Sequence, residues 1–146
     1  MEEELLKAKK KAMNLLLHND RTEKQLRDKL KTAGFSEVAE EEAVSYVKSF
    51  GYIDDYRYAR RYVEIYQNRK SRQQLVVDLQ RKGVSQECIG QAIEEEWQGD
   101  DAALKHYLDK KTRNLSDMDY QTRKKLAASL YRKGFSLSDI HRFLDL

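Results

Sequence analysis

The phrase Leu-x-x-x-Leu-x-x-x-Gly-(Phe/Val)-Ser occurs three times along this chain of 146 residues. The glycines of the three copies are Gly34, Gly83 and Gly134, so successive copies lie 49 and 51 residues apart. A period of this size marks a repeat architecture, in which each copy buries its apolar face against its neighbours. Stacked repeats usually form extended binding surfaces, so the feature favours binding over catalysis.

The composition favours helix in every copy. The chain has no proline and only six glycines, and residues with high helix propensity dominate it. No segment alternates between apolar and polar residues as a half-buried strand would. We therefore predict an all-α fold of nine helices, arranged as three tandem three-helix repeats that form an elongated, curved helical array. The predicted repeats cover residues 1–50, 51–98 and 99–146.

Capping signals place several helix starts. Thr22 with Gln25, and Ser71 with Gln74, fit the capping box, in which two side chains satisfy the first amides of a helix. Asp54 fits the N-cap of a helix that is predicted to run to about Arg69. The glycine of each repeated phrase suits the left-handed position that ends a helix, and the serine after it suits the next N-cap.

Positive charge recurs with the same period. The segments 7–31, 57–82 and 105–133 contain nine, eight and nine Lys and Arg against three, two and three Asp and Glu, which gives each segment a net charge of +6. The third helices of the first two repeats are acidic instead. The net charge of +3 for the whole chain therefore conceals strongly basic segments that alternate with acidic ones. Any single charge has about even odds of being only a solvated helix face, but three recurrences favour a basic surface.

The glycine-centred phrase also resembles the turn of a DNA-binding helix-turn-helix motif. In that motif the helix after the turn enters the major groove. Here the helices after Gly34 and Gly83 carry the acidic runs 40–42 and 94–96, which would face phosphates. Because affinity for DNA comes largely from Lys and Arg, sequence-specific recognition of this kind is disfavoured.

No catalytic or metal-binding pattern is present in the sequence. His18, His106 and His141 have no Cys or carboxylate partners at ligand spacing, and no glycine loop of the phosphate-binding type occurs. Cys88 is the only cysteine, which excludes an internal disulfide and fits a reducing compartment. No stretch reaches the ~20 apolar residues of a membrane span. We predict a soluble cytoplasmic monomer that is not an enzyme and holds no metal or cofactor.

The segment between the first two phrases resembles a known family. The run Gly51-Tyr52-Ile53-Asp54-Asp55, followed by Arg57-Tyr58-Ala59, is similar to the signature of the RecX family of bacterial recombinase regulators. The flanking phrases around Thr22 and Gly83 agree with the family in order, and the third repeat matches more loosely. One departure is Asn68-Arg69-Lys70-Ser71, where family members often carry a glycine.

This resemblance implies a partner and a function. Proteins of the family bind the RecA recombinase in the groove of its filament on single-stranded DNA. There they limit filament extension, ATP hydrolysis, strand exchange and the co-protease activity towards LexA. A rigid body with recurring basic surfaces could follow a groove lined by repeating subunits, because several modest contacts then add up. Weak contact with single- or double-stranded DNA stays open, as does a helical-repeat adaptor with a different partner.

The middle repeat holds the candidate binding residues, because it also holds the family signature. The predicted partner-binding residues are Arg57, Arg60, Arg61, Arg69, Lys70, Arg72, Arg81 and Lys82. The signature residues are predicted to be structural, and they are Gly51, Tyr52, Asp54, Asp55, Tyr58 and Ala59. Of these, Tyr52 and Tyr58 are expected to pack between repeats, and Asp54 or Asp55 to cap a helix.

Overall fold

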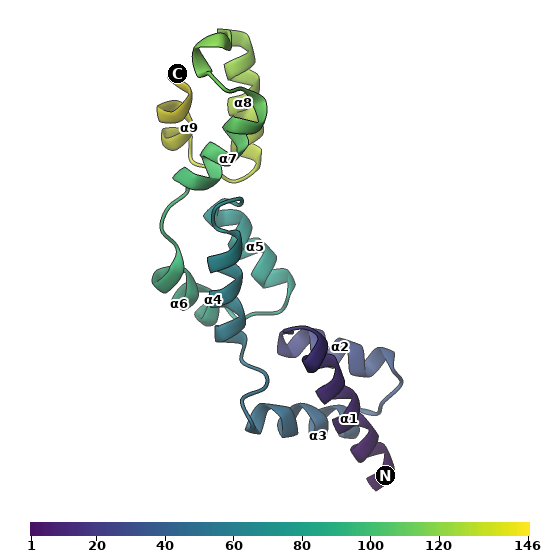
Figure 1. Ribbon diagram of the computed structural model, residues 1–146. Coiled ribbons are helices and arrows are strands. Elements are labelled where there is room, and N and C mark those ends of the chain that lie inside the picture. Colours follow the sequence, from purple (N-terminus) through teal and green to yellow (C-terminus); the bar gives the residue numbers. More distant parts are fainter. The chain divides into compact units, whose positions relative to one another are not determined.

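The computed structural model describes all 146 residues as nine α-helices, one short 3-10 turn and no strand, in agreement with the predicted all-α fold (Figure 1). The helices are α1 (Glu2–His18), α2 (Glu23–Thr32), α3 (Glu37–Ser49), α4 (Asp55–Tyr66), α5 (Arg72–Arg81), α6 (Gln86–Glu96), α7 (Asp101–Lys111), α8 (Tyr120–Arg132) and α9 (Leu137–Leu144), with the 3-10 turn η1 (Leu115–Asp117) between α7 and α8. We call α1–α3, α4–α6 and α7–α9 the first, second and third modules.

The chain forms two compact units, and the second module contributes to both of them. The first unit contains residues 1–59 and 79–91. The second unit contains residues 60–78 and 92–146. The first unit therefore holds the whole first module, and the second unit holds the whole third module.

The repeated phrase is the joint between the second and third helices of each module. Its glycines adopt φ values of +92° at Gly34, +89° at Gly83 and +100° at Gly134, which glycine alone adopts without strain. The residue after each glycine donates its amide hydrogen to the carbonyl of the phrase's second leucine, over 3.2, 3.1 and 3.3 Å. This is the Schellman arrangement that closes a helix. The fixed leucine-to-glycine spacing is thus a requirement of helix termination.

The serine of each phrase begins the third helix of its module. The Oγ atoms of Ser36, Ser85 and Ser136 accept from the amide three residues later, at 3.2, 3.2 and 3.1 Å. These are N-cap bonds, which satisfy amides that have no partner inside the helix. The phrase therefore specifies one helix end and one helix start within three residues.

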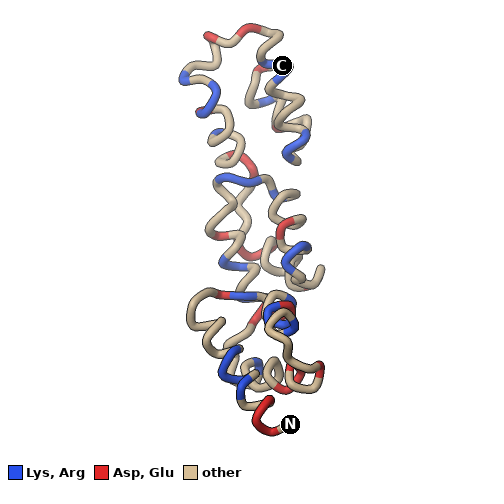
Figure 2. Tube along the Cα trace, turned by 90° about the vertical axis from the view of Figure 1, so that its right-hand side faces the viewer, with Lys and Arg blue, Asp and Glu red and all other residues tan.

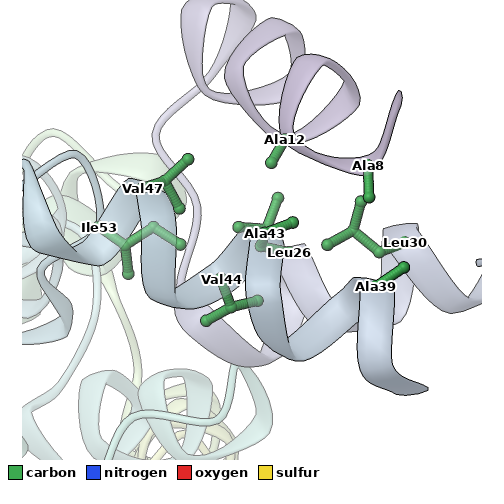
Figure 3. Close-up of a cluster of buried hydrophobic side chains, with 9 residues drawn as sticks. All are labelled: Ala8, Ala12, Leu26, Leu30, Ala39, Ala43, Val44, Val47 and Ile53. Carbon is green, nitrogen blue, oxygen red and sulfur yellow. The ribbon is translucent and has the colours of Figure 1, made fainter. Parts of the chain in front are cut away.

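The first module is held together by a core in which α1 lies against α3 and α2 (Figure 3). Ala8 and Ala12 of α1 face Ala39 and Ala43 of α3, and all four are fully buried. Small side chains at these positions allow the two helix axes to approach closely. The core is completed by Leu26, Leu30, Val44, Val47 and Ile53.

The third module has its own core within the second unit. Phe135, the residue after the glycine of the third phrase, is 2% exposed and meets the ring of Tyr107 edge-on, with the centroids 5.9 Å apart. The buried residues around it come from α7, α8 and α9. They are Ala103, Leu104, Leu126, Leu130, Ile140 and Leu144.

A pair of hydrogen bonds joins the first module to the second. The Thr22 hydroxyl at the start of α2 donates to the carbonyl of Lys82 at the end of α5, over 2.5 Å. The amide of Glu23 donates to the Asp55 carboxylate at the start of α4, over 2.9 Å. Burial raises the pKa of Asp55 above its ordinary value, against the lowering effect of this bond. We call this pair of bonds a clasp.

The same clasp joins the second module to the third. The Ser71 hydroxyl at the start of α5 donates to the carbonyl of Lys133 at the end of α8, over 2.7 Å. The amide of Arg72 donates to the Asp100 carboxylate, over 2.8 Å, and burial again raises the pKa of that carboxyl. Thr22 and Ser71 are buried. Because buried hydroxyls need partners, both residues are fixed by two roles at once, as N-cap and as donor in the clasp.

Two details differ from the sequence prediction. The helix that begins after Asp54 ends at Tyr66 rather than near Arg69, because the amides of Arg69 and Lys70 both donate to the carbonyl of Tyr66, over 3.0 Å, and close the chain into a turn. The capping box at Thr22 is complete. At Ser71 only the serine half forms: the backbone amide of Gln74 donates to the Ser71 hydroxyl, and the side-chain nitrogen of Gln74 donates to Asp78.

Candidate partner-binding surface

The eight predicted binding residues fall into both units. Arg57, Arg81 and Lys82 belong to the first unit, and the other five belong to the second. Lys and Arg recur along the trace of every module (Figure 2). The binding role of all eight residues remains a prediction. Arg61 is exposed on α4.

Aromatic rings orient the basic residues on the turn between α4 and α5. The Arg69 guanidinium lies over the ring of Tyr66 at 5.3 Å, and the Arg72 guanidinium lies over Trp97 at 5.8 Å. Both arginines are exposed. Such cation–π contacts restrict the side chain while leaving its hydrogen-bond donors available. The two guanidinium groups are therefore positioned to receive an acidic or phosphate group.

Lys70, between these arginines, is held inside a polar network. Its ammonium donates to Asp78 at 2.7 Å and to the Tyr62 hydroxyl at 2.9 Å. Partial burial acts to lower the pKa of Lys70, but these bonds outweigh it and the pKa is raised. Burial raises the pKa of Tyr62 to about 12, whereas bonds from Lys70, Tyr62 and Gln74 lower that of Asp78 against the effect of burial. Lys70 thus stays charged and braces the turn.

Arg60 joins α4 to α6 through an ion pair. Its Nε and Nη2 atoms both donate to one carboxylate oxygen of Glu96, at 3.0 and 2.7 Å. Its Nε also lies 3.4 Å from Glu95. An exposed pair of this kind stabilises little, so Arg60 can exchange its partner for another acid.

The basic residues of the first unit are arranged differently. Arg57 donates from Nη2 to the carbonyl of Gly51 at 3.2 Å, which folds its side chain back over the preceding loop. Arg81 is exposed in the last turn of α5. The carbonyl of Lys82 accepts the Thr22 hydroxyl in the clasp.

The signature residues surround the start of α4. The Asp54 carboxylate accepts from the amide of Arg57 at 3.0 Å, which is the N-cap bond that the sequence predicts. Ala59 is fully buried and Tyr58 is half-buried. Tyr52, which was expected to pack between repeats, stacks on Phe50 and leaves 48% of its surface exposed.

Gly51 and Asp55 complete the set. Gly51 adopts a φ of +72°, the left-handed region that favours glycine. The Asp55 carboxylate accepts the Glu23 amide in the clasp between the first and second modules. Both carboxylates of the signature therefore cap helix amides, Asp54 in its own helix and Asp55 at the start of α2.

Replacing Asp54 with alanine is expected to lower the free energy of unfolding by ~1 kcal/mol, because the first turn of α4 loses its cap. Urea denaturation followed by circular dichroism measures this loss. The Asp54→Asn variant is the control, since asparagine caps nearly as well. An Asp54→Ala protein of unchanged stability that fails in every binding assay would assign Asp54 to the binding surface instead.

Sequence reasoning missed the residues that hold the predicted cations in place. Tyr62, Asp78 and Gln74 form the network around Lys70, and Trp97 lies under Arg72. A lysine and an aspartate eight residues apart, on either side of a helix start, give no recognisable pattern. The clasp was also missed, although Thr22 and Ser71 share one position, 12 residues before the glycine of their phrase.

Fold and surface together define the class of protein: an all-helical tandem array of three-helix domains with exposed basic side chains on the turns and helix ends. Family models describing the first, second and third three-helix domains of RecX match residues 8–46, 54–93 and 99–144, in that order. The chain belongs to the RecX family of regulatory proteins.

Individual relatives agree with this assignment. A regulatory protein RecX of Caldanaerobacter subterraneus subsp. tengcongensis is 35% identical over 146 residues, covering 98% of this chain and 72% of the relative. One from Clostridium botulinum is 30% identical over 131 residues, covering 88% of this chain and 60% of the relative. These relatives are named as regulatory proteins rather than as enzymes.

A solved structure has the same fold. The crystal structure of RecX from Lactobacillus salivarius superposes with a TM-score of 0.81 at 26% identity, covering 99% of both chains. A second RecX crystal structure, at 22% identity and a TM-score of 0.76, covers 97% of this chain and 71% of its own, and shows the fold alone. In the present structure, none of the helices combines the length and the apolar character needed to cross a bilayer.

Proposed function

We propose that this protein is a negative regulator of the RecA recombinase. In this proposal it binds in the groove of the RecA filament on single-stranded DNA. It thereby limits filament extension, ATP hydrolysis, strand exchange and co-protease activity. The observation that carries the proposal is the match to all three RecX domains in order, with the family signature intact at the start of α4.

The geometry of the second unit supports the choice of binding residues. Arg69 and Arg72 are exposed and held by aromatic rings, and Lys70 keeps the turn between them rigid. Cations that are already ordered lose less side-chain entropy when a partner binds. An acidic protein surface or a DNA backbone inside the filament would be recognised by this turn.

The test removes four of the eight predicted binding charges together, all of them in the second unit. A variant with Arg60, Arg61, Arg69 and Arg72 replaced by alanine should inhibit the DNA-dependent ATPase of RecA about fourfold to several hundredfold more weakly, since four exposed ionic contacts of ~0.2–1 kcal/mol each contribute ~0.8–4 kcal/mol together. Helicity and melting temperature should change little. The assay is ATP hydrolysis by RecA on single-stranded DNA as a function of inhibitor concentration.

The control variant removes the same net charge from the third module. Its substitutions replace Lys111, Arg113, Lys125 and Arg132 by alanine, and all four residues are exposed. It should inhibit like the wild type. Equal inhibition by both quadruple variants would remove the proposed binding residues, and no inhibition by stoichiometric wild-type protein would contradict the proposed function itself. Tight binding to DNA without RecA, with a steep salt dependence, would favour a nucleic-acid-binding module instead.

A further inference from the structure

Helix α1 carries a second apolar stripe beside the one that enters the core. Ala8 and Ala12 are buried, whereas Leu6 and Leu17 are exposed over 55% and 77% of their surfaces. Met13 lies between these two leucines in the sequence and is half-buried. Positions 6, 13 and 17 recur at the spacing of one helix face. The stripe therefore presents aliphatic side chains to solvent along the length of α1.

Three aromatic rings extend this stripe towards the end of α3. Tyr46 meets Phe50 edge-on, with the centroids 5.2 Å apart, and Phe50 stacks on Tyr52 at 5.5 Å. The three residues are 39%, 58% and 48% exposed. Rings that pack on one another while facing solvent form an ordered apolar surface, so little entropy is lost when a partner covers it.

Two shallow grooves connect the stripe with the rings. The first, of about 520 Å³, is lined by Leu6, Lys9, Lys10, Met13, Asn14 and Tyr46. The second, of about 290 Å³, is lined by Met13, Leu16, Leu17, Gly51, Tyr52 and Arg57. Met13 belongs to both, so the grooves are neighbours within the first unit. We use the name α1–α3 face for the surface formed by Leu6, Met13, Leu17, Tyr46, Phe50 and Tyr52.

The charged residues that line the two grooves of the α1–α3 face are all basic. Lys9, Lys10 and Arg57 line the grooves, and no Asp or Glu does. Lys9 lies over the Tyr46 ring at 5.0 Å and forms a long ion pair with Glu42 at 3.8 Å, outside the groove lining. An apolar floor with a basic rim is complementary to an apolar segment that is bordered by acidic residues. Amphipathic helices bind grooves in this way, with side chains at helical spacing as anchors.

We propose that the α1–α3 face docks an apolar segment bordered by acidic residues on a RecA subunit, and this inference rests on the proposed function. A second copy of this chain fits less well, because the two basic rims would face each other. Single-stranded DNA also fits less well, because its bases could stack on the rings of the face but would leave the aliphatic Leu6, Met13 and Leu17 without an apolar partner. The face lies in the first unit, whereas the arginines of the ATPase test lie in the second.

The test replaces Leu6, Leu17 and Phe50 by serine in the full chain. All three side chains are more than half exposed, so the variant should fold like the wild type. Binding of the fluorescently labelled chain to RecA filaments on single-stranded DNA, followed by anisotropy, should weaken at least about tenfold, which corresponds to ~1.4 kcal/mol. The matched control replaces Tyr120, Tyr131 and Leu137, which are 61%, 58% and 52% exposed in the third module, by serine. Its affinity should stay within about twofold of the wild type.

A charge variant gives a second, independent measurement. Lys9→Glu with Lys10→Glu keeps the apolar floor and reverses the rim, so filament binding should again weaken about tenfold or more. If the wild type binds filaments and the serine and glutamate variants bind equally well, the inference is wrong while the proposed function stands. If the wild type itself does not bind, both fail. A serine variant that loses a wild-type dimer in sedimentation, or loses binding to DNA alone by the same factor, would also overturn the assignment to RecA.

Discussion

Replacing Gly83 with alanine should destabilise the protein by about 2–5 kcal/mol, from left-handed strain and overpacking together. Gly83 has a φ of +89°, where a side chain costs ~1–2 kcal/mol. A Cβ atom there would also lie 2.4 Å from the Cβ of Lys24, at the start of α2. The Cβ of Lys24 is bonded directly to the backbone and cannot rotate away, so the first and second modules must shift apart at the clasp. Urea denaturation with the change in free energy extrapolated to water measures the loss.

Gly34→Ala is the matched control for this prediction. Gly34 has nearly the same φ, +92°, but nothing lies within 4 Å of the position that its Cβ would take. It should therefore show only the conformational cost, ~1–2 kcal/mol. Equal losses for the two variants would show that α2 accommodates the added methyl group at no cost, and would contradict the overpacking part of the prediction.

Replacing Ser71 with alanine should destabilise the protein by about 2–4 kcal/mol, because one hydroxyl serves two bonds. Its Oγ accepts from the amide of Gln74 at 3.1 Å and donates to the carbonyl of Lys133 at 2.7 Å. Losing the cap costs ~1 kcal/mol. Leaving a shielded carbonyl without a donor costs ~1–3 kcal/mol more. Thermal and urea unfolding of the full chain both report the change.

Ser136→Ala isolates the cap from the clasp. Ser136 makes the same N-cap bond at 3.1 Å, to the amide of Asp139, and its side chain is exposed. The same chemical change should therefore cost ~1 kcal/mol. If both serine variants lose the same free energy of unfolding, the hydrogen bond to Lys133 makes no net contribution to stability. A larger loss at Ser71 would measure the strength of the clasp directly.

The repeated phrase made the fold predictable from the sequence. The helix count, the N-caps at Thr22, Asp54 and Ser71, and the glycine-ended helices all follow from local rules, in which the partners lie within five residues of one another. The end of α4 was predicted too late, and Gln67, just past that end, bonds through its side chain to residues about 30 positions away. A bond between distant residues leaves no periodic trace in a sequence.

The candidate site was less predictable than the fold. Charge counting found the basic stretch 57–82 but could not distinguish Lys70, which is held by Asp78, from Arg69, which lies over a ring. The α1–α3 face was not predicted, because its aliphatic residues lie in the same stretch of sequence as the residues of α1 that enter the core. Only the packing shows that Leu6 and Leu17 lie outside it.

The clasp also bears on how the number of repeats in such a chain can change. The second module takes part in both clasps. Its Asp55 and Lys82 accept hydrogen bonds from the first module, and its Ser71 and Arg72 donate hydrogen bonds to the third. A tandem duplication of that module would thus find a compatible neighbour on either side. The third module begins its second helix with Asp119, whose carboxylate caps the helix but has no proton to donate to another module's carbonyl. Growth of the array by duplication is therefore simplest at the middle.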